Sequence, residues 1–298
     1  MKNIPITNAQ TVWQLWLDGA KDLVAVWDMP PSREDRYQYD NQRRALNSTN
    51  HRRFFGVNTE QEARKVLLEG YPYGARLVTD LAAKVSETLP PPKSRRRVRK
   101  WRDDGDELNT ERLQAGHDTC WRSMHRQLKS ACGLVEIVAG WGSDCGASQD
   151  RLQWSGAAAL ALTDLLEKAD YSVELALIAA MEAYDQHQQQ TASLVRVDLK
   201  RMGELVDIEQ LAAVAVYPPA WRLYGLCAFQ QGPYSSGGSF NGHPHSNFQA
   251  YAPNGMWNYR PNVMTLVLPE SHSESAAQYN VLEALKSLES LVNPQDAE

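Results

Sequence analysis

The chain has 298 residues, of which 43% are hydrophobic and 22% are charged, with 15 Pro and 18 Gly. This composition is globular and excludes a fibre, a collagen and a wholly disordered chain. No apolar run approaches the about 18 residues of a membrane-spanning helix, and the first residues lack the apolar core of a signal peptide. We therefore expect no contact with a membrane and a cytoplasmic location.

The net charge of -5 hides an uneven distribution along the chain. Residues 33–129 carry 21 Lys and Arg against 14 Asp and Glu, a net charge of +7. The remainder carries 10 against 22, a net charge of -12. Such asymmetry indicates that one region meets a polyanion, while the acidic remainder serves solubility or a basic partner.

The first part of the chain is expected to be helical. Residues 12–17 are apolar densely enough for the start of a buried helix. Thr59 with Glu62 three residues later fits a capping box, which predicts a helix from that point. After an interruption at residues 70–74, apolar residues continue at helical spacing until Pro90, which must end the helix.

From residue 133 the pattern becomes that of an α/β domain, because apolar strands alternate with helices. This alternation predicts a mostly parallel sheet flanked by helices on both faces. We place an N-terminal helical and basic region at residues 1–130 and the α/β domain at 131–298. The expected strands are residues 134–139, 171–178, 194–199, 223–229 and 263–268, and the expected helices are 154–169, 208–216 and 276–291.

The most unusual stretch follows Pro92, where seven cations occur in ten residues. DNA presents closely spaced phosphates that Lys and Arg neutralise, and an aromatic ring among them offers a face on which a base stacks. The alternative is a solvated turn in which the run is balanced by the acidic residues at 103–107. The candidate nucleic-acid-binding residues here are Lys93, Arg95, Arg96, Arg97, Arg99, Lys100, Trp101 and Arg102.

A second basic and aromatic cluster lies between residues 36 and 53. Two such clusters could line one nucleic-acid groove, although the sequence does not show that they share a face. Its tyrosines lie among polar neighbours and are candidates for stacking. Phe54 and Phe55, which follow directly, fit core positions better. The candidate residues of this cluster are Arg36, Tyr37, Tyr39, Arg43, Arg44, Arg52 and Arg53.

Patterns for catalysis or metal binding are weak. His243 and His245 have no second ligand pair at tight spacing, so loop histidines explain them better than zinc does. The four cysteines, Cys120, Cys132, Cys145 and Cys227, form no C-x-x-C pair, and we interpret them as reduced thiols. No Gly-x-Ser-x-Gly sequence surrounds the serines near His243. We expect no enzyme activity, no metal and no cofactor.

The order of motifs resembles a family of uncharacterised phage and bacterial proteins. The resemblance is carried by Arg95–Arg97, residues 101–108, Arg112–Gly116, Trp121 with Arg122, and residues 154–158, and it covers roughly residues 33 to 229. It implies a divergent von Willebrand factor A-like fold in the second half. Such domains often carry an Asp-x-Ser-x-Ser metal site after the first strand, but residues 139–148 lack that spacing. Ser143, Asp144 and Ser148 alone would leave most of the coordination positions of a divalent ion to water.

The members of this family that are associated with a function are single-stranded-DNA-binding regulators of Schitoviridae-type podophages. They couple transcription to DNA replication and recruit a phage RNA polymerase. For this chain the resemblance implies single-stranded DNA and a phage RNA polymerase as partners, a homo-oligomer, and the host cytoplasm as location. The first alternative is a protein interaction module of von Willebrand factor A type that binds no nucleic acid. A metal-dependent or hydrolytic enzyme is the second.

Overall fold

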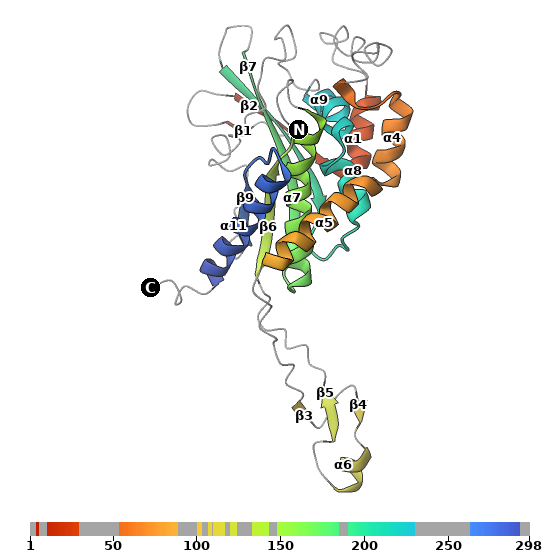
Figure 1. The fold of residues 1–298 in the computed structure, drawn as a ribbon, viewed down its shortest axis with the longest axis vertical. Coiled ribbons are helices and arrows are strands. Elements are labelled where there is room, and N and C mark those ends of the chain that lie inside the picture. The colour runs from red at the N-terminus through yellow and green to blue at the C-terminus, as the bar shows by residue number, and fades with distance from the viewer. Residues whose placement is uncertain are drawn as a thin grey trace.

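The computed structural model describes residues 4–5, 11–29, 54–88, 100–102, 107–108, 110–116, 120–123, 133–142, 148–184, 190–229 and 263–292. Within them the chain forms a six-stranded sheet with helices packed on it, and a separate sheet of three short strands (Figure 1). The chain is thus an α/β protein, as its pattern of alternating strands and helices predicts.

The large sheet has the strand order β1-β2-β8-β7-β6-β9 and is mostly parallel. Three of its five pairings are parallel, namely β2 with β8, β7 with β6 and β6 with β9. The pairings β1 with β2 and β7 with β8 are antiparallel. The strands are β1 (Ile4–Pro5), β2 (Thr11–Asp18), β6 (Leu134–Gly140), β7 (Ser172–Tyr184), β8 (Gln190–Lys200) and β9 (Val263–Leu268).

The prediction of a helix over residues 12–17 is wrong, because this segment is strand β2. Leu17 is buried on the core side, whereas the neighbouring Trp16 is 42% exposed. Side chains that alternate in this way belong to a strand, and Trp16 pairs in register with Arg196 of β8. The helix begins only after the strand, as α1 (Gly19–Asp28).

The next two helices confirm the sequence prediction. Helix α4 (Glu60–Glu69) begins after Thr59, whose Oγ1 accepts a hydrogen bond from the backbone N of Glu62 at 3.1 Å. The Glu62 carboxylate accepts in return from the backbone N of Asn58 at 3.3 Å, one residue before the usual capping-box partner. Helix α5 (Pro72–Thr88) ends before the prolines that were expected to stop it.

The second half also follows the prediction, with one exception. The expected elements are found as β6, β7, β8, β9, α7 (Gln149–Lys168), α8 (Ile208–Ala215) and α11 (Glu274–Val292). Residues 223–229, expected as a strand, instead lie in the π-helix η1 (Ala220–Gly225) and the helix α9 (Leu226–Phe229). A short, wholly buried apolar run has no periodicity that separates strand from helix.

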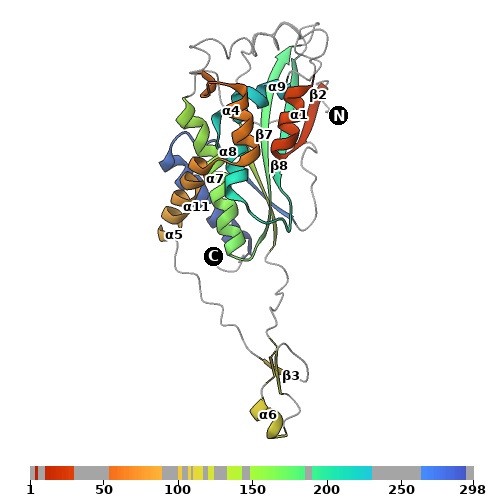
Figure 2. The same ribbon diagram turned by 90° about the vertical axis from the view of Figure 1, so that its right-hand side faces the viewer.

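The described helices pack together against one face of the sheet (Figure 2). Alternate residues of the strands, such as Val135 and Ile137 of β6, join a single hydrophobic core with residues from every long helix. That core includes Leu23 of α1 and Val78 of α5. It therefore crosses the domain boundary that the sequence placed at residue 130. The second face of the sheet, on which helices were also expected, carries none of the described ones.

Gly156 marks the closest approach between α7 and α8. A Cβ atom at this position would overlap the backbone carbonyl group of Ala215 in α8. We expect Gly156→Ala to destabilise the protein by about 2 kcal/mol, since overpacking outweighs the better helix propensity of alanine. The measurement is the denaturant midpoint of unfolding. A Gly156→Ala variant as stable as the parent would show that α8 moves away at little cost.

A second, smaller sheet is inserted between α5 and β6. Its strand order is β3-β5-β4, with β3 (Lys100–Arg102), β4 (Glu107–Leu108) and β5 (Trp121–Ser123), and both pairings are antiparallel. The short helix α6 (Thr110–Gln114) connects β4 towards β5. Figures 1 and 2 show this sheet as a body distinct from the six-stranded sheet.

Candidate nucleic-acid interface

The small sheet contains the end of the basic run. Strand β3 consists of Lys100, Trp101 and Arg102 and pairs along its whole length with β5. In this register Trp101 lies opposite Arg122, and Arg102 lies opposite Trp121. Residues directly opposite each other in an antiparallel pair share a face of the sheet. The register therefore pairs each tryptophan of this ribbon with an arginine of the neighbouring strand.

The acidic segment after the run does not pair with the basic strand. Because β5 separates β3 from β4, Glu107 of β4 lies opposite Arg122 and not opposite a residue of β3. The strand pairing places only Glu107 of the acidic segment, so the alternative of a charge-balanced turn stays open. Asp103, Asp104 and Asp106 lie outside the described residues.

Most of the other candidate DNA-binding residues also lie outside the described part of the chain. This applies to both the first half of the basic run and the whole second cluster. These residues are Lys93, Arg95, Arg96, Arg97, Arg99, Arg36, Tyr37, Tyr39, Arg43, Arg44, Arg52 and Arg53.

Phe54 and Phe55, next to the second cluster, belong to the core, as their pattern suggested. Phe55 is 3% exposed, and Phe54 packs edge-on against it with ring centroids 5.2 Å apart. The guanidinium of Arg222, which is buried in η1, lies 4.5 Å from the centre of the Phe54 ring and donates to the Phe54 carbonyl oxygen. Neither ring is placed to stack on a base.

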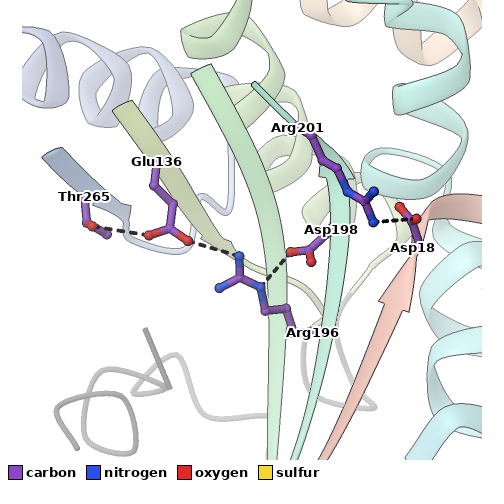
Figure 3. A network of polar contacts seen from close by, with 6 residues as sticks. All are labelled: Asp18, Glu136, Arg196, Asp198, Arg201 and Thr265. Carbon is purple, nitrogen blue, oxygen red and sulfur yellow. Dashed lines mark hydrogen bonds and ion pairs between the residues drawn. The ribbon is translucent and has the colours of Figure 1, made fainter. Parts of the chain in front are cut away.

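A network of charged side chains occupies the face of the large sheet away from the described helices (Figure 3). We call it the Arg196 cluster. Arg196 of β8 donates from Nη2 to Glu136 of β6 at 3.0 Å and from Nε to Asp198 at 2.6 Å. Thr265 of β9 donates to the second oxygen of Glu136 at 3.3 Å. The Arg196 guanidinium also lies 4.9 Å from the centre of the Trp16 ring. The members are Trp16, Glu136, Arg196, Asp198 and Thr265.

The cluster links strands that are not neighbours, because β7 lies between β8 and β6. The register places Ala176 of β7 opposite Asp198, and an alanine there leaves room for the arginine to pass over the strand. Glu136 is 3% exposed and the Arg196 side chain 9%. A second ion pair, Arg201 with Asp18 at 2.7 Å, lies nearby but is 61% exposed on both sides.

One donor of this cluster is unused. Nη1 of Arg196 is buried and has no hydrogen-bond partner among the described residues. A buried N–H without a partner costs about 1–3 kcal/mol, and buried ion pairs are on average no more stabilising than apolar residues. Unpaired buried donors of this kind are uncommon in native proteins.

Sequence reasoning missed the Arg196 cluster, although a signal was present. Glu136 lies between two apolar residues in a strand predicted to be buried, and Arg196 and Asp198 alternate with apolar residues in another. Charged residues are almost never fully buried without a partner. Charges inside two buried strands therefore predict that the strands share an ion pair.

The described residues give no support to the weaker patterns for a metal site or a hydrolase. Ser148 caps α7, accepting from the backbone N of Arg151 at 3.3 Å, while Ser143 and Asp144 lie outside the described residues. Cys227 is buried, and His272 faces Glu270 at 3.4 Å. Within the described part of the chain no three His, Cys, Asp or Glu side chains are placed to hold a metal ion. None of its helices is long and apolar enough to cross a membrane.

Comparison with known proteins yields one match. A family model described as a domain of unknown function matches residues 7–291, which is nearly the whole chain. No curated protein and no solved structure matches.

Proposed function

We propose a function for this chain, which belongs to the DUF7192 family of domains of unknown function, from its own residues. It is a non-enzymatic protein that binds single-stranded DNA. Because it contacts the phosphate backbone of the DNA, these contacts give little sequence preference. Arginine and lysine side chains of the basic run contact phosphates, and tryptophans of the small sheet stack on bases.

The observation that carries this proposal is the pairing of β3 with β5. It sets Trp101 opposite Arg122 and Trp121 opposite Arg102 on a ribbon that continues directly from the basic run. Proteins that hold unpaired bases commonly do so on a sheet whose strands combine aromatic residues with cations. A duplex hides its base faces, so this arrangement favours single strands.

The charge distribution supports the same proposal. Residues 33–129, which include the small sheet, carry a net positive charge that attracts nucleic acid. The acidic remainder discourages coating of the rest of the chain by DNA. The resemblance described above extends the proposal to a phage regulator that recruits an RNA polymerase and self-associates. The unit β6-α7-β7, with parallel strands around a capped helix, supports a von Willebrand factor A-like fold for the large α/β body.

The test is fluorescence anisotropy of the full chain with labelled single-stranded DNA, duplex DNA and RNA, at about 50 to 300 mM salt. We expect tight binding that prefers single strands and weakens steeply as salt rises. Absence of binding at the lowest salt would exclude the proposal and leave the protein interaction module as the explanation of the charged surface.

Tryptophan substitutions test the stacking contribution separately from charge. We expect Trp101→Ala and Trp121→Ala each to weaken single-strand binding by about 1–3 kcal/mol, roughly 5- to 150-fold in Kd, with no change in the salt slope. Trp101→Phe keeps an aromatic face and should retain most of the affinity. Equal affinity of parent and both alanine variants would remove stacking from the mechanism.

A further inference from the structure

Strand β9 is the outermost strand of the large sheet, at the end of the strand order opposite to β1. It pairs with β6 over its whole length, from Val263 to Leu268, and no described strand pairs with its other edge. In a strand the N–H and C=O groups of every second residue point to the same side. Within the described part of the chain, β9 therefore presents a row of unpaired donors and acceptors, which is a template for another extended backbone.

The sequence of β9 lacks the features that keep edge strands apart. Natural edge strands are protected by charged residues, proline, bulges or very short length. Strand β9 has six residues, Val-Met-Thr-Leu-Val-Leu, without a charge or a proline, and its pairing with β6 keeps one register throughout. At the other end of the sheet, strand β1 has two residues and contains Pro5. The edge at β9 is thus the one suited to accept another strand.

The exposure of its side chains fits an accessible edge. Thr265 is exposed, and Val263, Met264 and Val267 are partly exposed. The neighbouring strand β6 is buried from Val135 to Ala139. The side chains of β9 are also neutral, so an identical strand beside it meets no like-charge repulsion, and valine and threonine favour strand pairing.

We infer that two copies of this chain associate through β9, by antiparallel pairing of β9 with β9. A twofold axis perpendicular to the sheet reverses the direction of the strand and keeps the helices of both copies on one side. The unpaired backbone groups of each edge then bond to those of the other, and one sheet continues through both copies. Because a twofold contact is closed, such a dimer leaves no β9 edge free for further growth.

Helix α11 supplies the area that the strand lacks. A strand of six residues is about 20 Å long, too small by itself for the about 800 Å² that each partner buries in a stable dimer. Helix α11 packs beside β9 (Figure 1), and the same axis sets both α11 helices on one side of the joined sheet. Its Tyr279 is 63% exposed, and Leu282 and Leu285 are only partly buried. These side chains are available to extend the contact.

This inference assigns a surface to the self-association in the proposed function, and it rests on that part of the proposal alone. A dimer also carries two small sheets and two basic runs. Two linked sites hold a long single strand more tightly than one site does, because the second contact is intramolecular.

The experiment measures the molar mass of the full chain by light scattering over a range of concentrations, without nucleic acid. We expect twice the 33.5 kDa of one chain at high concentration. Val267→Lys should weaken the dimer by at least about tenfold, since it places a lysine of each copy on the shared edge. Val267→Thr, which is neutral and β-branched, should keep the dimer. Thr79→Lys, which adds the same charge at an exposed position of α5, should keep it too.

Hydrogen exchange of the parent chain tests the surface without any variant. Every second amide of β9 should exchange slowly where the dimer forms and fast after dilution to the monomer. The amides of β2, near the other end of the sheet, should not depend on concentration. Protection that depends on concentration in β2 and not in β9 would place the contact at the wrong edge and overturn the inference.

The outcomes separate this inference from single-strand binding. A chain that is monomeric at all concentrations but binds single strands overturns the inference and leaves DNA binding intact. A β9 dimer that binds no nucleic acid supports the inference and removes the proposed function. A Val267→Lys chain that circular dichroism shows to be folded, and that dimerises as tightly as the parent, overturns the assigned edge.

Discussion

Replacing Arg95, Arg96, Arg97 and Arg99 with alanine is expected to produce the largest change in DNA affinity. Each arginine that neutralises a phosphate of a single strand contributes about 0.7 to the slope of log K against log salt, so four contacts contribute about 3. We expect the quadruple variant to lose at least about tenfold in affinity at roughly 100 mM salt. Its slope of log K against log salt should be shallower by about 3. Anisotropy titrations of parent and variant at several salt concentrations measure both quantities.

A control for the position of the charge uses two cations outside the proposed interface. Lys65 and Lys286 lie on helices of the large body, are 70% and 68% exposed, and form only intrahelical ion pairs in the described structure. Their replacement by alanine should leave affinity and salt slope nearly unchanged. If the quadruple variant binds as tightly as the parent, with the same slope, the basic run has no part in binding.

The second large effect is expected on stability, from Arg196→Met. This change leaves the buried Glu136 carboxylate without its cation, and breaking a buried pair from one side costs about 3–5 kcal/mol. Denaturant unfolding, followed by circular dichroism, measures the loss. The variant should unfold at a clearly lower denaturant concentration, because the uncompensated charge stays buried at 3% exposure.

Two further variants separate charge burial from loss of packing. Arg201→Met breaks the neighbouring pair with Asp18, which is 61% exposed, and should cost only about 0–1 kcal/mol. Adding Glu136→Gln to Arg196→Met removes the orphaned charge and should restore part of the stability. A single Arg196→Met variant as stable as Arg201→Met would show that the Arg196 cluster is not effectively buried.

Elements defined by local signals were predictable from the sequence. Helix α4 begins where Thr59 and Glu62 stand three residues apart, since both capping contacts lie within one turn. Helix α5 stops before the prolines because proline lacks the donor that a helix needs. The apolar strands β6 and β9 carry their own pattern and were likewise found at the expected places.

Segments whose state depends on distant partners were not predictable. Trp16 and Leu17 lie in a strand because β8, far along the chain, pairs with them. Leu223 and Phe229 lie in helical segments because the core surrounds them, and burial on every side erases the periodicity by which strand and helix differ. The same holds for the domain boundary, since only packing reveals that the core extends across residue 130.

The candidate sites divide in the same way. The sequence alone identifies a basic run with Trp101 inside it, because charge density and aromatic content are properties of composition. Only the tertiary structure sets Trp101 opposite Arg122 and joins Glu136 of β6 to Arg196 and Asp198 of β8. Strand order and register are set by long-range pairing, which no local pattern specifies, and therefore the fold determines which side chains meet.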